Sequence, residues 1–270
     1  MRRRLGLLAV VLIAVAGCGG GSHSAARERA TSTATAAPVS AADRPCTEPG
    51  VRAQAIRFGT SDGVMLSGAV VGSGPVGAVL IHEWPLDYCG WLPYAGYLSR
   101  HGVRALAFDL RCFGRSPCPD GRGHPTTDVA AAMAELRRRG ARRVALAGAS
   151  MGGAIAVVAA ARLHPAAVVD LSGERDTTGL TPGIAADAGP AAPGVTAPAL
   201  FAVARGDRYV SPADMRAVAR QTRAATRRVI VLPASAGHGW ALLVGTTTEW
   251  SPLAATVAAF IRRHAGGRPE

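Results

Sequence analysis

Apolar residues along this chain fall into two patterns. Short apolar runs are typical of strands, and longer stretches with apolar residues on one helical face are typical of amphipathic helices. Strands are predicted at residues 51–58, 64–71, 76–81, 103–108, 144–147, 167–171, 198–204 and 228–232. Helices are predicted at residues 91–100, 126–139 and 154–163, and two more begin at Ser211 and Ser251.

The order of these elements predicts an α/β fold. Residues 59–63, Gly-Thr-Ser-Asp-Gly, are a hairpin signal, so the first two strands are expected to be antiparallel. The later strands alternate with helices, which favours a mostly parallel sheet with helices on both faces. Thr126 is the expected cap of its helix, which Gly140 follows. Residues 173–197 are rich in Gly and Pro and predict a minimal lid.

The first 44 residues indicate export. An apolar run at 5–16 is too short to span a bilayer, and the small residues before Cys18 resemble the lipobox of bacterial lipoproteins. We expect a signal peptide at 1–18 with Cys18 lipidated, a disordered tether at 19–44 and one folded α/β domain at 45–270. This places the protein on the extracytoplasmic face of the cell membrane, held by its lipid. The alternative is an ordinary secretory signal with an incidental cysteine.

The charge of the chain changes this picture little. The formal net charge is +12, and arginine alone supplies the basic residues because the sequence contains no lysine. The arginines are scattered and aromatic residues are few, so nucleic-acid binding is not expected. Attraction to anionic lipid or wall polymer is compatible with such a charge and is unspecific.

Four further cysteines, Cys46, Cys89, Cys112 and Cys118, predict two disulfides in an exported chain. Three pairings are possible. We favour Cys112–Cys118 across a short loop, with Cys46–Cys89 holding the N-terminal segment. Metal ligation is the alternative, although no pair has C-x-x-C spacing and no histidine is suitably spaced. We expect neither a metal nor an organic cofactor.

The stretch 148–152, Gly-Ala-Ser-Met-Gly, has the pattern G-x-S-x-G between a predicted strand and a predicted helix. A serine on such a turn has its hydroxyl pushed out at the end of the sheet. The N-terminus of the following helix presents N–H groups to developing negative charge. Ser150 is therefore a candidate nucleophile, and a glycine-rich helix start is the alternative in a chain with 33 glycines.

A nucleophilic serine needs a base, and the base needs a group that orients it. In sheets of this type, sites form at the carboxyl ends of the strands, so the candidates are polar residues just after strands. His238 follows the last strand and is the predicted base, ahead of His164 and His264. Asp207 follows the strand at 198–204 and is the predicted acid, ahead of Asp170.

An oxyanion formed at this serine needs two N–H donors. Met151, the residue after the nucleophile, is the first predicted donor. The second is expected from the turn after the third strand, where we prefer Trp84 to Glu83. Glu83 and Trp240 are the predicted substrate contacts, and His82 is expected to be a structural side chain of the turn.

Together these residues resemble the α/β-hydrolase family across nearly all of residues 50–265. The order Ser, Asp, His along the chain is the order that this fold uses. Glu83 stands where the family usually has glycine. A glutamate at this position resembles the dienelactone-hydrolase-like branch, whose best-known members use a cysteine nucleophile. The segment with Asp109, Arg111 and Arg115 is mainly structural in the family, which implies an internal ion pair. The resemblance rests on residues 81–85, 108–111, 114–116, 148–153, 206–207 and 237–239.

The resemblance implies a monomeric serine hydrolase that transfers an acyl group to water. Ser150 would attack, His238 would carry the proton and Asp207 would orient the imidazole. We expect a small-molecule ester with a short acyl chain, because residues 173–197 offer few bulky apolar side chains for a lipid-binding lid. A peptidase of the same fold and a non-catalytic binding protein at the cell surface are the alternatives.

Overall fold

The computed structural model describes residues 46–119, 121–177, 184–245 and 249–266. The predicted signal peptide with Cys18 and the predicted tether lie outside the described residues. No helix within the described ranges is both long enough and apolar enough to cross a membrane.

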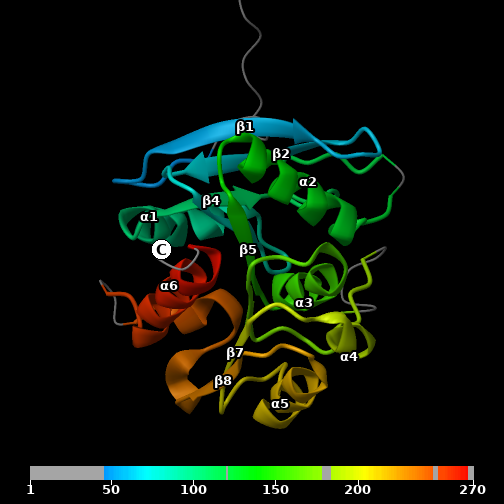
Figure 1. Cartoon of the computed structure of the whole chain (residues 1–270), viewed down its shortest axis with the longest axis vertical. Helices are drawn as coiled ribbons and strands as arrows, with labels where there is room; N and C mark the ends of the chain where they lie inside the picture. Colours follow the sequence, from blue (N-terminus) through cyan, green and yellow to red (C-terminus); the bar gives the residue numbers. More distant parts are fainter. Residues whose placement is uncertain (1–45, 120, 178–183, 246–248, 267–270) are drawn as a thin grey trace, which may run out of the picture. The chain divides into compact units, whose positions relative to one another are not determined.

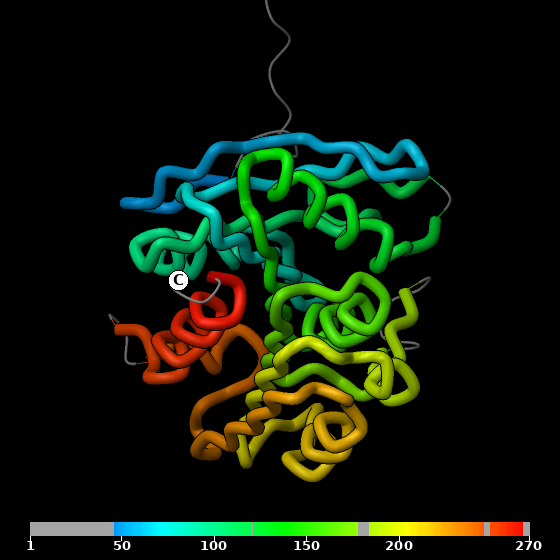
Figure 2. Tube along the Cα trace, in the orientation of Figure 1, coloured from blue at the N-terminus to red at the C-terminus, as the bar shows by residue number. Residues whose placement is uncertain are grey.

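The described residues form one eight-stranded sheet with the order β1-β2-β4-β3-β5-β6-β7-β8. β1 and β2 are antiparallel, β2 is antiparallel to β4, and the strand pairs from β4 to β8 are parallel. This confirms the predicted mostly parallel sheet with its leading hairpin, and Figure 2 shows the blue β1 and the orange β8 at opposite ends of it. The strands are β1 (Ala53–Gly59), β2 (Met65–Val71), β3 (Val76–Ile81), β4 (Val103–Phe108), β5 (Arg143–Ala149), β6 (Val168–Leu171), β7 (Ala199–Ala204) and β8 (Arg227–Leu232).

Helices cover both faces of the sheet, as the alternation of elements predicts. Figure 1 shows α2, α3 and α5 on one face and α1 and α6 on the other. The helices are α1 (Leu92–Arg100), α2 (Pro125–Arg138), α3 (Met151–Leu163), α4 (Ala188–Ala191), α5 (Pro212–Gln221) and α6 (Pro252–Ala265). Short 3-10 turns are η2 (Tyr88–Trp91), η3 (Ala192–Gly194), η4 (Ala234–Ala236) and η5 (Gly239–Leu243).

The two faces of the sheet carry side chains of different size. Val79 and Ile81 point towards α2 and α3, whereas Ala78 and Leu80 alternate to the face under α1 and α6. Small strand residues on that second face leave room for the aromatic side chains of α1, and the Tyr94 hydroxyl donates to the Ala254 carbonyl at 2.9 Å. The buried strand alanines of this face are Ala69, Ala78, Ala105, Ala107, Ala145, Ala147, Ala149, Ala202 and Ala204.

The predicted start of α2 is wrong. The helix begins at Pro125 with His124 as its N-cap residue, and no side chain caps it, so Thr126 is not the cap. Proline at the first helical position lacks the N–H that would otherwise need a partner there, which explains the earlier start. Asp128, in the first turn, is fully buried and binds the Arg111 side chain.

The connection after β6 is more regular than its sequence indicates. Residues 173–197 contain α4 and η3, seven residues of short helical turns that the Gly and Pro content did not predict. Ile184 is 3% exposed and Val195 is fully buried, so both belong to the core. Leu180, the third bulky apolar residue of the segment, lies outside the described part of the chain.

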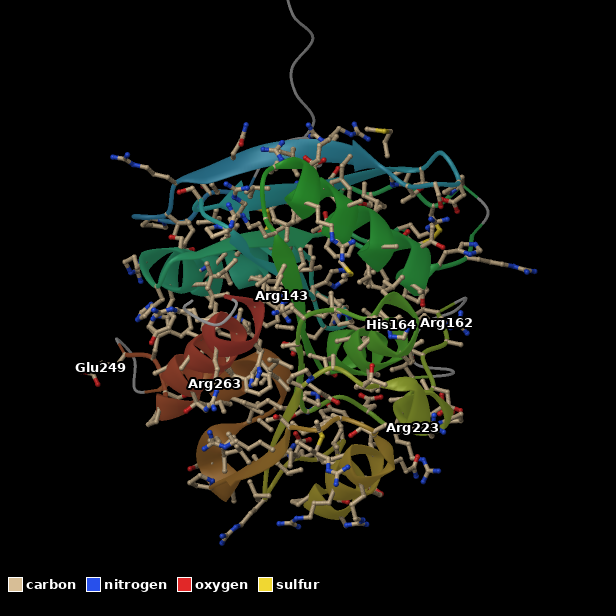
Figure 3. The ribbon with its side chains drawn as sticks, viewed as in Figure 1. Arg143, Arg162, His164, Arg223, Glu249 and Arg263 are labelled. Atoms are coloured by element: carbon tan, nitrogen blue, oxygen red, sulfur yellow. A yellow bond between two sulfur atoms is a disulfide. The ribbon has the colours of Figure 1, made fainter. Side chains whose placement is uncertain are left out.

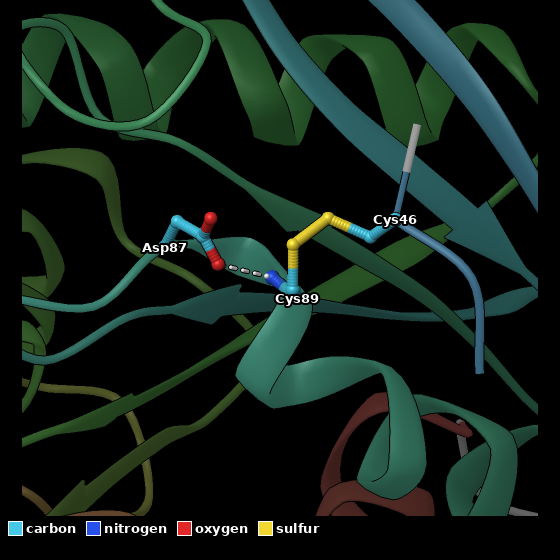
Figure 4. A group of neighbouring side chains, drawn as sticks. All are labelled: Cys46, Asp87 and Cys89. Atoms are coloured by element: carbon cyan, nitrogen blue, oxygen red, sulfur yellow. Dashed lines mark hydrogen bonds between the residues drawn. A yellow bond between two sulfur atoms is a disulfide. The ribbon is translucent and has the colours of Figure 1, made fainter. Parts of the chain in front are cut away.

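Both favoured disulfides are formed, Cys46–Cys89 and Cys112–Cys118. Figure 4 shows the first of them beside Asp87, whose carboxylate accepts the Cys89 N–H at 2.9 Å. Cys46, Asp87 and Cys89 are also the one group of three potential metal ligands found among the described residues. Because its two sulfur atoms are bonded to each other, they are not available as thiolate ligands.

Candidate active site

Ser150 occupies a sharp turn between β5 and α3. β5 ends at Ala149 and α3 begins at Met151, and Ser150 between them has φ 49° and ψ −121°. The Ser150 N–H donates to the Leu171 carbonyl at 2.9 Å, and the Ser150 carbonyl accepts the Gly153 N–H at 2.8 Å. A non-glycine residue adopts such a backbone conformation only where its surroundings enforce it. This turn presents the serine side chain at the carboxyl edge of the sheet.

The glycines around Ser150 are required by close approach of the backbone. A side chain at Gly148 would collide with the Gly152 carbonyl, and a side chain at Gly152 would collide with the Ile81 carbonyl of β3. The strand, the turn and the first turn of α3 are therefore in contact without side chains between them. This contact explains why the motif needs glycine at its first and last positions.

His238 and Asp207, which follow β8 and β7, bind each other. The His238 Nδ1 atom lies 2.8 and 2.9 Å from the two carboxylate oxygens of Asp207, whose side chain is fully buried. The Tyr209 and Val210 N–H groups donate to the same carboxylate at 2.9 and 3.1 Å. An ionised carboxylate at Nδ1 holds the proton there, which leaves Nε2 as the basic nitrogen.

Several groups keep Asp207 ionised. Burial raises the pKa of Asp207, but the Ser172 hydroxyl, the two backbone N–H groups and His238 together hold it below its ordinary value. The Ser172 hydroxyl is close to this carboxylate but forms no hydrogen bond of normal geometry. The carboxylate is therefore charged at neutral pH and can stabilise an imidazolium.

The loop that carries His238 lies against Ser150. Gly239 has φ 57°, and a side chain at this position would collide with the Glu83 carboxylate and lie 3.5 Å from the Ser150 Cβ atom. The residue next to His238 is thus in contact range of Ser150. Ser150, Asp207 and His238 follow β5, β7 and β8 and lie at the same edge of the sheet.

The two rejected histidines lie at the opposite edge. His164 is the C-cap of α3, a helix of 13 residues that begins next to Ser150 and is therefore about 20 Å long. Figure 3 shows His164 at that far end of α3 and Arg143 at the start of β5. Burial and the charges of Arg263 and Arg143 lower the pKa of His264, which places His264 near the start of β5 as well. Neither histidine is near the serine.

The rejected acid is isolated from these groups. Asp170 of β6 is fully buried, and its carboxylate accepts the Gly173 N–H at 2.6 Å. No arginine or histidine contacts it within the described residues. Burial raises the pKa of Asp170 to about 7, and only the Gly173 N–H opposes this effect. A carboxyl in this environment cannot orient His238.

His82 fixes the turn that follows β3. The Glu83 carbonyl lies 3.1 Å from His82 Nδ1 and accepts the Leu86 N–H at 2.9 Å. The Leu110 N–H donates to His82 Nε2 at 3.2 Å, so the ring carries its proton on Nδ1. Burial lowers the pKa of His82 to about 4, and the imidazole is neutral. The Glu83 carbonyl and the Trp84 N–H share one peptide plane, so these bonds also fix the direction of that N–H.

The two predicted oxyanion donors are the backbone N–H groups of Met151, next to Ser150, and of Trp84, in the turn after β3. Met151 is the first residue of α3 and is fully buried. The Trp84 N–H makes no hydrogen bond within the described part of the chain, and Trp84 is 52% exposed. A backbone N–H without a protein acceptor in this turn is suited to receive an oxyanion.

The two predicted substrate contacts bind each other. Glu83 Oε2 accepts the Trp240 N–H at 3.0 Å, which joins the turn after β3 to the His238 loop. Burial raises the pKa of Glu83, while the Trp240 N–H and His238 oppose the rise. Glu83 therefore holds the His238 loop in place and brings a carboxyl group close to His238.

Glu174 is a residue of the site that sequence reasoning missed. Burial raises the pKa of Glu174, and interactions with His238 and the Ser150 hydroxyl oppose the rise, so Glu174 lies beside both groups. It follows Gly173 directly after β6, and the rule that identified Asp207 could have identified it too. Tyr209 also lies over the imidazole, with ring centroids 4.7 Å apart.

The segment after β4 forms internal ion pairs, as the resemblance implies, and they involve both Arg111 and Arg115. Arg111 is buried and binds Asp128 and Asp62, each at 2.7 Å, and not Asp109. Asp109 instead accepts backbone N–H groups, including that of Arg115 at 2.8 Å. Arg115 also lies 3.9 Å from the Asp109 carboxylate through its guanidinium. These charges tie β1–β2, β4 and α2 together and do not reach Ser150.

Comparison with known families assigns the fold. The family model described as the alpha/beta hydrolase family matches residues 64–269. The chain belongs to the α/β-hydrolase family. No curated protein sequence matches the chain significantly.

Several solved structures are similar to most of the chain. An esterase of Pyrococcus furiosus is 17% identical with a TM-score of 0.65, over 82% of this chain and 97% of that one. A thermophilic esterase from Thermogutta terrifontis is 19% identical with a TM-score of 0.61, over 78% and 99%. A monoacylglycerol lipase from Paleococcus ferrophilus is 15% identical with a TM-score of 0.61, over 74% and 99%. At these identities the likeness establishes a shared fold.

Proposed function

We propose that this α/β-hydrolase is an exported, lipid-anchored serine hydrolase that cleaves small or short-chain carboxylic esters. One observation carries the proposal. His238 Nδ1 lies 2.8 Å from the buried Asp207 carboxylate, and the loop that holds His238 lies against Ser150 at its strand–helix turn. A serine, a base and an orienting acid in this arrangement support acyl transfer through a covalent intermediate.

The chemistry follows from these positions. The Ser150 oxygen attacks the ester carbonyl while His238 Nε2 takes its proton, and Asp207 stabilises the imidazolium. N–H groups of Met151 and Trp84 bind the oxyanion of the tetrahedral intermediate. The C–O bond to the alcohol then breaks as the imidazolium returns a proton to the alcohol. Water, activated by the same imidazole, releases the acid from the acyl-enzyme.

The connection after β6 supports short substrates. Its described helical elements are four and three residues long, too short to form an amphipathic cover over an acyl groove. Ile184 and Val195 are buried in the core and are not available to line such a groove. A substrate with few methylenes would therefore be preferred.

The N-terminal sequence supports the anchor. Cys18 follows an apolar run and small residues, and acyl chains on its sulfur and amino group would hold the domain at the membrane surface. The tether between Cys18 and the domain is rich in Gly, Ser, Thr and Ala and would leave the site free to meet soluble esters.

The test uses the full-length protein in detergent with a fluorophosphonate probe and p-nitrophenyl acetate. Wild type should be labelled and should hydrolyse the ester, and Ser150→Ala should do neither, with kcat lower by about 10⁴-fold or more. Ser73→Ala is the matched control, because Ser73 is exposed in the loop before β3 at the opposite edge of the sheet. Labelling of Ser150→Ala at the wild-type rate would overturn the proposal.

A further inference from the structure

A pocket of about 400 Å³ is lined by Glu83 and Trp240, which lie beside Gly239 in the loop that carries the proposed base His238. Glu83 and Trp240 form one wall of it, and their hydrogen bond ties that wall to the His238 loop. We call it the Trp91 pocket. Its lining includes Glu48, Glu83, Asp87, Trp91, Pro93 and Trp240.

The charge of the Trp91 pocket is opposite to that of the chain. Three carboxylates line it, from Glu48, Glu83 and Asp87, and no arginine does. Glu48 forms no ion pair among the described residues, and the Glu83 carboxylate accepts only a backbone N–H there. Asp87 shares its charge with Arg115 at 3.2 Å. An acidic pocket in a chain of formal charge +12 points to a positively charged ligand.

The walls of the pocket narrow the class of cation. Trp91 and Trp240 supply indole rings, and Pro93 adds apolar surface. Aromatic faces beside carboxylates attract organic ammonium groups, because cation–π and charge interactions act together where water is excluded. A compact metal ion would gain nothing from the indole walls and would lack a set of converging oxygen ligands.

A second observation concerns Trp240 itself. Its indole Nε1 atom is buried and has no hydrogen-bond acceptor among the described residues. A buried donor without a partner is costly. The side chain that carries it lines the Trp91 pocket and lies two residues from the proposed base His238.

We propose that the substrate is an ester that carries an ammonium group, and that this group occupies the Trp91 pocket while the ester carbonyl lies at Ser150. The inference rests on the proposed ester hydrolysis and adds the charge of the substrate to it. An uncharged acyl group would meet the same apolar walls without the electrostatic gain. An anionic one would be repelled by the three carboxylates and by Glu174 beside Ser150.

The experiment compares two p-nitrophenyl esters of equal size with the full-length protein in detergent. One is the ester of trimethylammonium butyrate, and the other is its neutral isostere with a tert-butyl group. We expect the ratio of their kcat/KM values to favour the cation by about tenfold or more at low salt and to fall as salt rises. Glu48→Gln and Glu83→Gln should each lower the ratio several-fold. Glu249→Gln, a carboxylate that Figure 3 shows at the periphery, is the matched control and should not lower it.

The outcomes separate this inference from the function on which it rests. A ratio near one in the wild type, with probe labelling and neutral ester hydrolysis intact, would overturn the cationic substrate and leave the serine hydrolase standing. A high ratio that both glutamine variants preserve would overturn the Trp91 pocket as the binding site. Glu48 takes no part in the hydrogen bond between Glu83 and Trp240. The Glu48→Gln variant therefore tests the pocket even if Glu83→Gln fails to fold. If the wild type is not labelled by the probe and hydrolyses neither the cationic nor the neutral ester, the proposed serine hydrolase itself would be overturned.

Discussion

Replacing Asp170 with asparagine should make the folded protein more stable at alkaline pH while leaving catalysis in place. The Asp170 carboxyl is buried without a positive partner in the described structure, and burial raises its pKa to about 7. Asparagine keeps an oxygen that can accept the Gly173 N–H, now 2.6 Å from the carboxylate. It removes the charge that the wild type must bury when this group ionises.

The sign and size follow from proton linkage. In the unfolded chain the group has its ordinary pKa of 3.8, so between that value and about 7 the folded state binds more protons. The stabilisation by the protonated carboxyl is therefore fully present below pH 3.8 and is lost as the pH rises through 7. At about 1.36 kcal/mol per pKa unit, the free energy of unfolding of the wild type should fall by about 2.5 kcal/mol between about pH 5 and about pH 8 from this group alone.

The assay is urea unfolding of wild type and Asp170→Asn at both pH values, with the disulfides intact. The variant should lack this part of the pH dependence, so the difference in unfolding free energy between the two proteins should change by about 2.5 kcal/mol between them. Asp214→Asn, which removes an exposed carboxylate, is the control for loss of a charge. Equal pH dependence in wild type and Asp170→Asn would refute the reasoning.

Three further outcomes are expected. Asp207→Asn should lower kcat for p-nitrophenyl acetate by about 10⁴-fold, whereas Asp170→Asn should not, and the reverse order would mean that the acid is misassigned. Cys18→Ser should release the protein from membranes into the aqueous phase of a detergent partition, and unchanged partitioning would contradict the lipid anchor. Among neutral p-nitrophenyl esters from acetate to palmitate, kcat/KM should be highest for short chains; a steady rise with length would reveal an acyl groove.

The sheet and the edge that carries the site were predictable because they depend on local pattern. Short apolar runs separated by helical segments predict parallel strands, and parallel strands bring the residues that follow them to one edge. That rule alone led from Ser150 to Asp207 and His238. It applies equally to Glu174, which lies just after β6, but the Gly and Pro content of residues 173–197 predicts only a connection there.

The remaining differences arise from contacts that sequence pattern does not encode. Arg111 binds Asp62 and Asp128, which lie 49 and 17 residues away in the sequence, and nothing local selects them over Asp109. Asp128, in the first turn of α2, is therefore bound to the buried Arg111 side chain. α4 is only four residues long, and its sequence, Ala-Gly-Pro-Ala, has no apolar periodicity to detect. Tertiary packing decides such elements, and propensity does not.

The loop that carries the proposed base follows β8, which is an edge strand of the sheet. β8 pairs with β7 alone among the described strands, and its residues range from exposed to half-buried. Detaching an edge strand takes less free energy than unfolding the core, so β8 and the loop with His238 should open before β5 and Ser150 do. Inactivation would then precede denaturation: activity should decline at lower urea concentrations than the far-ultraviolet circular dichroism, and backbone amides of β8 should exchange faster than those of β5. The opening of β8 and the His238 loop would then determine how long the enzyme stays active, even while the rest of the sheet remains folded.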